Sequence, residues 1–316
     1  MVKARTKTPE ELAAEQAAIA KANRQTTIIG VVFVVIIALI IGTIGFFIWK
    51  GNQPKTADVI PSFVDNKGAI VITKDGVDKN GSRWNNINSQ KENTINGLPI
   101  LGNGQDPLCP GCGAIEREIG TAVKYWVKTG KIVYKQYPIA IMNRLSNGTN
   151  YSTRVSAAFY RMAEVDPEHY LDFVEIMYDE SVQPKESSFQ DIPDEKIAEY
   201  AEKAGATKEQ AQQVIDGKYK DYVDANTDNL SNDESLFRTS SDGTKSFMTP
   251  LVLINGTVVN DFSADDFTSW LAGQFNLQVP SESELESVSA TAKTTTNEKV
   301  QSSTTDDNAD SNESKE

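Results

Sequence analysis

The chain is organised around the stretch Asp106-Pro107-Leu108-Cys109-Pro110-Gly111-Cys112-Gly113. This stretch contains both cysteines of the 316 residues, with two residues between them. Such a pair is typical of half a zinc site, a small structural disulfide or a redox-active dithiol. A zinc site needs two further sulfur or imidazole ligands, and the chain has no third cysteine and a single histidine, His169. We therefore expect no metal, and no other cofactor.

The redox interpretation has a physical mechanism in this stretch. A structural bridge that closes so small a loop constrains the unfolded chain little. If Cys109 caps a helix whose first turn contains Pro110, unpaired N–H groups and the helix dipole favour a thiolate there. We expect Cys109 to be the nucleophile and Cys112, one turn further in, to be the resolving thiol. Pro110 and Gly111, between them, are assigned to the same site.

The ends of the chain differ in amino-acid composition from its middle part. The formal net charge is -13, but Ser281–Glu316 alone contains nine acidic and three basic residues. The remainder, roughly 57–279, is only mildly acidic and predicts one domain of a little over 200 residues. Because such a surface offers no positive patch to a phosphate backbone, we expect no nucleic-acid partner.

The segment from Thr27 to Trp49 contains no charged residue. At about 1.5 Å per residue it is long enough to span a bilayer core of about 30 Å. It exceeds the apolar region of a cleaved signal peptide, and no small-x-small cleavage site follows it. Five basic residues precede it, against three in the stretch that directly follows it (Lys50, Lys55 and Lys67), which predicts a cytoplasmic N-terminus. We expect a single-pass signal anchor in the cell membrane, with the cysteines outside the cytoplasm, where disulfides persist.

The pattern of apolar residues predicts how the rest of the chain is divided. β-branched runs predict strands near 69–73, 98–101, 131–138 and 250–254, the last followed by an Asn255-Gly256 hairpin turn. Helical spacing follows Cys112 and recurs from Ser152 to about Tyr222. The predicted parts are a cytoplasmic arm (1–26), the anchor (27–49), a linker (50–67), a domain (68–278) with a helical insert (about 151–240), and a disordered acidic tail (279–316).

These motifs together resemble the thioredoxin fold. The resemblance lies in a strand, a Cys109-Pro110-Gly111-Cys112 helix start, a second strand, and a late Thr249-Pro250 before a hairpin. The long helical insert before Thr249 makes the chain similar to membrane-anchored DsbA-like thiol-disulfide oxidoreductases. This implies an α/β (α+β) fold with a central mixed sheet flanked by helices. It also implies that Pro250 is cis and that the backbone of Thr249 binds an extended substrate.

The resemblance implies an enzyme that forms disulfides in cysteine-containing exported proteins and that a membrane partner reoxidises. Two residues depart from the family. Asn103 stands where many members have a buried acid, and Pro110-Gly111 contains no thiolate-stabilising histidine. The redox direction therefore stays open, with a reductase or isomerase as one alternative and a tethered binding or chaperone-like module as another. We expect Asp106 to shuttle protons or to cap a turn, and His169 to be a surface or packing residue.

Overall fold

The computed structural model describes residues 57–84, 94–95, 97–240, 242–260 and 266–288, and in addition Pro9, Leu39, Ile40, Gly42 and Thr43. The chain divides into two compact units, Met1–Pro54 and Lys55–Glu316, and the fold described below is that of the second. Of the predicted membrane anchor, 27–49, the structure describes four residues, so this prediction lies outside the described part. Within the described part, no helix has the length and apolar character needed to cross a bilayer.

A mixed sheet of seven strands forms the centre of the domain, as predicted. Its order is β2-β1-β5-β4-β8-β9, with β3 paired to β4. Strands β4 and β5 are parallel, and the other pairs are antiparallel. The strands are β1 (Ile70–Thr73), β2 (Gly76–Val77), β3 (Thr94–Ile95), β4 (Leu98–Gln105), β5 (Val133–Pro138), β8 (Leu251–Ile254) and β9 (Thr257–Val258).

Strand β4 determines where the cysteine pair lies. It pairs with β5 on one side and β8 on the other, so it occupies the middle of the sheet. It ends at Gln105, and helix α2 (Pro110–Lys128) begins five residues later. The pair therefore lies at the carboxyl end of a central strand, an edge where α/β sheets commonly place ligands.

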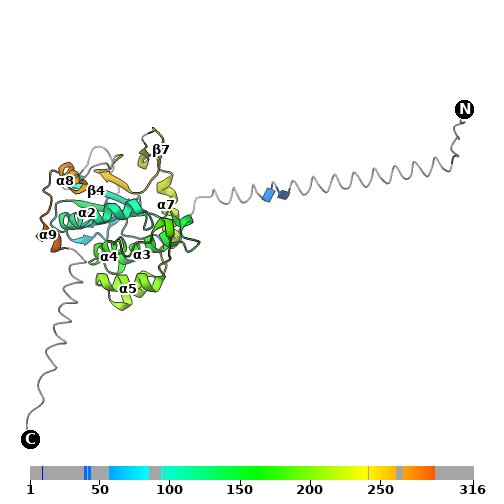
Figure 1. The fold of residues 1–316 in the computed structure, drawn as a ribbon, viewed down its shortest axis with the longest axis horizontal. Helices are drawn as coiled ribbons and strands as arrows, with labels where there is room; N and C mark the ends of the chain where they lie inside the picture. The colour runs from blue at the N-terminus through cyan, green and yellow to red at the C-terminus, as the bar shows by residue number, and fades with distance from the viewer. Residues whose placement is uncertain are drawn as a thin grey trace, which may run out of the picture. The chain divides into compact units, whose positions relative to one another are not determined.

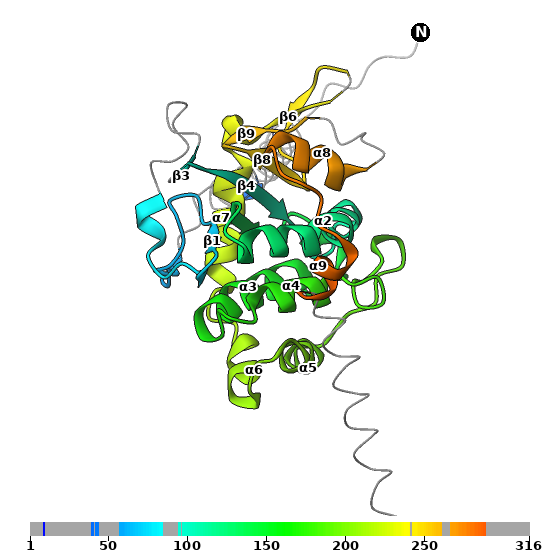
Figure 2. The same ribbon diagram turned by 90° about the vertical axis from the view of Figure 1, so that its left-hand side faces the viewer.

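The helices form layers on the sheet, and the predicted insert supplies most of them. Helix α2 contacts β1 and β5 on one side and α4 on another, and α3 contacts α4, α6 and α7. In Figures 1 and 2 the helices α3, α4 and α5 lie below α2, and Figure 2 shows α5 and α6 farthest from the sheet. The remaining helices are α3 (Tyr151–Val165), α4 (Tyr170–Met177), α5 (Asp194–Ala204), α6 (Lys208–Val214), α7 (Lys220–Ser231), α8 (Phe267–Gln274), α9 (Glu282–Glu286) and the 3-10 turns η1 (Gly81–Trp84), η2 (Asn143–Leu145), η3 (Glu186–Ser188) and η4 (Glu234–Leu236).

A short hairpin that was not predicted lies at the end of the insert. Its strands are β6 (Arg238–Thr239), within the last residues of the predicted insert, and β7 (Lys245–Ser246), which follows it and precedes β8. Gly243 supplies the positive φ, 82°, in its connecting turn. Two-residue strands carry too little apolar alternation to be recognised from sequence.

The predicted linker, 50–67, extends too far into the domain. Phe63 and Val64 are buried in the main core. Asp65 is buried as well and accepts a 2.9 Å hydrogen bond from Nζ of Lys135, on the central strand β5. A buried charge of this kind requires a partner, and the pair holds residue 65 against the sheet. The packed domain therefore begins before the predicted boundary at 68, since Ala57 also contacts the main core and Pro61 is buried.

The predicted disordered tail, 279–316, also begins too early. Ser281 and Glu284 form a capping box that starts α9. The hydroxyl of Tyr125, on α2, donates a hydrogen bond to Glu284, and Val288 is buried. These contacts hold the first part of the tail against α2, while 289–316 lie outside the described residues.

Candidate active site

The cysteine pair opens α2 as predicted. Cys109 is the N-cap residue, with extended backbone angles, and Pro110 is the first helical residue. The amide of Cys109 donates to the carbonyl of Asp106 at 3.0 Å, and its carbonyl accepts from Gly113 at 3.2 Å. Both thiols are unbridged, and Cys112 is fully buried whereas Cys109 retains 6% of its surface. Cys109 is thus the more accessible sulfur.

The surroundings give the two thiols different acidities. A hydrogen bond with the Cys112 thiol lowers the pKa of Cys109 to about 7, against the opposing effect of burial. Burial raises the pKa of Cys112 well above its ordinary value. At neutral pH a large share of Cys109 is therefore thiolate, while Cys112 keeps its proton.

The Thr249-Pro250 loop lies directly beside the pair. Its peptide bond is cis, which confirms the prediction. Sγ of Cys109 is 3.6 Å from the carbonyl oxygen of Thr249. A Cβ added to Gly111 would lie 3.1 Å from Cδ of Pro250, so a side chain at residue 111 would crowd this loop. The six residues predicted for the site are thus brought together although the insert separates the cysteine loop from the Thr249-Pro250 loop in the sequence.

Asp106 caps a turn, one of the two roles expected for it, and also makes longer-range contacts. Its Oδ1 accepts hydrogen bonds from the amide of Leu108 at 2.8 Å and the hydroxyl of Ser152 at 2.7 Å. Its Oδ2 accepts from the amide of Met142 at 2.9 Å. Burial raises the pKa of Asp106 to about 6 despite these donors. The carboxylate joins the cysteine loop to the β5–α3 connection and to α3.

Glu116 is a site residue that the sequence reasoning missed. It lies four residues after Cys112, hence on the same face of α2. Its Oε2 accepts a 2.8 Å hydrogen bond from Gln105, whose Oε1 accepts one from Gln136, also at 2.8 Å. Burial raises the pKa of Glu116 to about 7. An acidic residue in an otherwise apolar helix face, one turn after a cysteine, was the available signal.

Asn103 and His169 take no direct part in the site. Asn103 is buried in β4, and its amide donates to the hydroxyl of Tyr134 at 3.3 Å. It occupies the position of the family's acid, and the buried carboxyl group is instead that of Glu116, on α2. His169 is part-exposed and lies 2.8 Å from Asp166, which agrees with a surface role.

The comparisons with known proteins agree with this geometry. A family model described as "Thioredoxin" matches residues 105–273. The chain is similar to oxidised DsbA of Mycobacterium tuberculosis (25% identity, TM-score 0.50), with 71% of this chain and 99% of that one covered. It is also similar in fold to reduced DsbG of the same organism (24%, TM-score 0.51, 73% and 96% covered). MdbA of Actinomyces oris, a thiol-disulfide oxidoreductase, shares the fold at 16% identity (TM-score 0.50, 73% and 94% covered).

One curated relative matches over a shorter region. The serine/threonine-protein kinase PknE of Mycobacterium tuberculosis is 29% identical over 102 residues. The match covers 32% of this chain and 18% of the kinase, so the chain spans less than a fifth of that relative's length.

We expect the Cys109 thiol to titrate at about pH 7. Cys112→Ala should raise this pKa, because it removes the hydrogen bond that lowers it most. The measurement is the rate of alkylation by iodoacetamide as a function of pH. Cys109→Ala is the control and should leave no thiol that reacts at neutral pH, since Cys112 is buried. An unchanged profile in Cys112→Ala would contradict the assignment.

The protein should become less stable as the pH rises, through Glu116. Its folded-state pKa is raised from 4.5 to about 7, so between these values the folded protein holds a proton that the unfolded chain has lost. The contribution is complete below about pH 4.5 and lost above about pH 7, in total about 3 kcal/mol. Urea unfolding across this range should show a smaller loss in Glu116→Gln than in the wild type. The loss that remains belongs to Asp106, whose pKa burial raises from 3.8 to about 6. The exposed Glu202→Gln is the matched control, and equal slopes in wild type and Glu116→Gln would refute the prediction.

Proposed function

Because the chain belongs to the thioredoxin family, we propose that it is a membrane-anchored, extracytoplasmic thiol-disulfide oxidoreductase that forms disulfides in exported proteins. The observation that carries the proposal is the pairing of an acidic, accessible Cys109 with a buried, protonated Cys112 at the start of α2. A disulfide that only stabilises the fold does not require the two thiols to differ in pKa. A thiol-disulfide exchange catalyst requires this difference, because the thiolate is the reacting form.

In the proposed reaction the oxidised pair accepts two electrons from a substrate dithiol. A substrate thiolate attacks Sγ of Cys109, the Cys109–Cys112 bond breaks, and Cys112 leaves and takes up a proton. A second substrate thiolate then attacks the substrate sulfur of the mixed disulfide and releases Cys109 as a thiolate. The depressed pKa of Cys109 favours this last step, because a more acidic thiol is the better leaving group.

We assign to Glu116, one turn after Cys112 on the same face of α2, the exchange of the proton that Cys112 gains and loses. Asp106, whose charge acts on both thiols and whose pKa is about 6, is the alternative carboxyl group. The Glu116 pKa of about 7 leaves both protonation states of this residue populated near neutral pH, which is what a proton donor and acceptor needs. Its hydrogen bond from Gln105 holds the carboxyl group in place on the buried side of α2. Asn103 cannot replace it, since an amide does not titrate.

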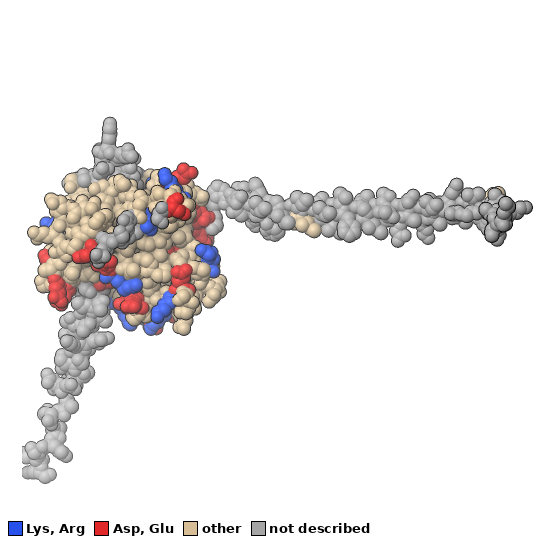
Figure 3. Space-filling view, turned by 45° about the horizontal axis from the view of Figure 1, so that its top comes forward, with Lys and Arg blue, Asp and Glu red and all other residues tan. Residues whose placement is uncertain are grey.

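We assign substrate binding to the Thr249-Pro250 loop. The Thr249 carbonyl faces the Cys109 sulfur at 3.6 Å, within reach of a peptide whose cysteine reacts there. Recognition through the backbone suits an enzyme that acts on many cysteine-containing proteins. Figure 3 shows one face of the molecule, on which acidic and basic side chains of the described residues lie among each other and a large area carries no charge.

The reverse direction, as a reductase or isomerase, is the second candidate, and one observation favours it. The nucleophilic thiol has a pKa of about 7 in thioredoxin and about 3.5 in DsbA, and the value of about 7 for Cys109 resembles the former. A reduction potential near -120 mV would establish the oxidase, whereas one near about -270 mV would establish the reductase. In the oxidase direction, a membrane partner or a small oxidant must reoxidise the pair.

The exchange activity can be tested with the full-length chain in detergent and a reduced two-cysteine substrate. The wild type, first oxidised to the Cys109–Cys112 disulfide with glutathione disulfide, should oxidise this substrate. In a second assay with the disulfide form of the substrate, the Cys109 thiolate of Cys112→Ala should attack that disulfide and release the other substrate sulfur as a thiol. The mixed disulfide at Cys109 should then accumulate, because no resolving thiol remains. Cys109→Ser should form no such adduct. If the double variant Cys109→Ser/Cys112→Ser kept full biological activity, the tethered binding module would be the correct function instead.

The proposed location rests on the uncharged segment 27–49 and on the excess of basic residues before it. With the N-terminus in the cytoplasm, an affinity tag placed after Glu316 should be digested by protease added to intact spheroplasts. A cytoplasmic control protein should survive the same treatment. Protection of the tag until the membrane is lysed would show the opposite orientation.

A further inference from the structure

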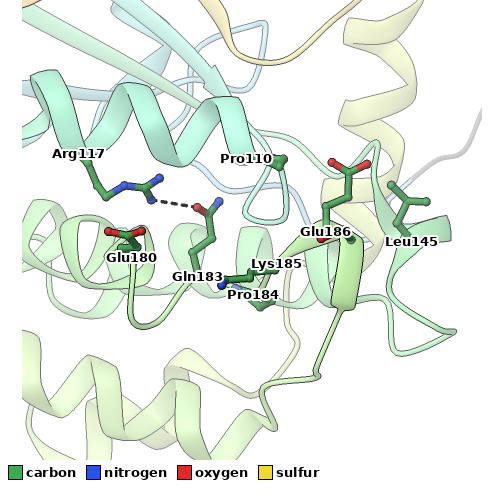
Figure 4. A pocket seen from close by; sticks show the side chains of 9 residues that line it. Pro110, Arg117, Leu145, Glu180, Gln183, Pro184, Lys185 and Glu186 are labelled. Carbon is green, nitrogen blue, oxygen red and sulfur yellow. Dashed lines mark hydrogen bonds between the residues drawn. The ribbon is translucent and has the colours of Figure 1, made fainter.

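The side chain of Gln183 joins the insert to the first turn of α2. It lies between α4 and η3, and its Nε2 donates to the carbonyl oxygens of Pro107 at 3.1 Å and Cys109 at 3.0 Å. Its Oε1 accepts from Nη1 of Arg117 at 3.1 Å, the bond drawn in Figure 4. The amide thus presents its nitrogen to two acceptors and its oxygen to a donor. The flipped amide would lose all three bonds.

Arg117 fixes the orientation of this amide. It extends from α2, and its Nη1 also donates to the carbonyl oxygen of Tyr178, the C-cap of α4, at 2.8 Å. We call Gln183, Arg117 and the carbonyls of Pro107 and Cys109 the amide clamp. The clamp forms one wall of an open pocket of about 540 Å³ beside Pro110.

Gly113 provides independent support for the clamp. A Cβ added to this residue would lie 1.9 Å from Oε1 of Gln183 and 2.7 Å from Nη1 of Arg117. Any side chain at residue 113 would therefore displace the amide. Glycine is a poor residue for a helix interior, costing about 1 kcal/mol relative to alanine. Its presence directly after Cys112 is explained by the space that the clamp needs.

We propose that Gln183 is a positioning residue for thiol-disulfide exchange, which holds the peptide group of Cys109 and thereby the placement of the reactive sulfur. The inference rests on the proposed function for its biological meaning. Gln183 is not a catalytic residue, because its amide contacts the Cys109 carbonyl and not the sulfur.

The clamp acts on the carbonyl of the N-cap residue of α2. The Cys109 carbonyl receives one long helical hydrogen bond, 3.2 Å from Gly113, and the Gln183 amide supplies a second, shorter one. If the peptide group rotated, Sγ would move away from the Cys112 thiol, whose hydrogen bond lowers its pKa most. The N–H dipoles of the Gln183 amide also add positive potential at the helix start, which favours the thiolate.

The first test replaces Gln183 by methionine, which keeps the length of the side chain and removes both donors. In the full-length chain, Gln183→Met should raise the Cys109 pKa by about half a unit to one unit, the effect of one modest hydrogen bond. Alkylation rate against pH is the readout. Gln190→Met, an exposed residue of the same segment, is the matched control and should not shift the titration.

The second test displaces the Gln183 amide by a substitution at residue 113. Gly113→Ala should raise the Cys109 pKa by a similar amount, because the new methyl group displaces the amide. The double variant should shift no further than either single variant, since both remove the same contact. The unfolding midpoint of each variant is measured alongside, so that a shift in the Cys109 pKa can be separated from a loss of stability.

The outcomes separate the alternatives. An unchanged titration in Gln183→Met, or shifts that add in the double variant, would overturn the proposal. A lower unfolding midpoint with an unchanged titration would show that Gln183 is only structural, and would also overturn it. The titration needs no substrate, so it reports on the clamp even if the protein proves not to catalyse disulfide exchange.

Discussion

The carboxylate of Asp106 joins the three segments between which the cysteine pair lies. Its hydrogen bonds reach the cysteine loop, the β5–α3 connection and the first turn of α3. Burying a carboxyl group away from water costs free energy unless several hydrogen-bond donors satisfy its oxygens. If these segments separated, the Asp106 carboxyl group would lose its donors, so the contacts hold the segments together. The thiolate of Cys109, the cis loop at Thr249 and the clamp of Gln183 all depend on the position of this one turn.

The Cys109-Pro110 start of α2 could be predicted because it depends on two neighbouring residues. The cis bond before Pro250 was predicted from the resemblance to DsbA-like proteins, since an X-Pro bond taken by itself is usually trans. The mixed sheet and the helical insert followed from periodicity together with the resemblance to DsbA-like proteins. The sequence also signalled the order of these motifs, which is what made the resemblance specific.

The missed features depend on contacts between distant segments. Asp65 is held against the sheet by its ion pair with Lys135, a residue seventy positions later in the chain. Residues 281–288 are held in place by contacts such as that of Tyr125, which no composition rule can reveal. Gln183 and Gly113 are unremarkable singly, and each explains the other only when α2 and the loop after α4 lie side by side.

The chain packs against the domain soon after the proposed anchor. Ala57 contacts the main core and Pro61 is buried, so at most residues 50–56 separate that anchor from the packed domain. Seven extended residues span at most roughly 25 Å. If residues 27–49 cross the membrane as proposed, a connection of this length would keep the cysteine pair near the bilayer. The substrates within its reach would then be chains that emerge from the membrane.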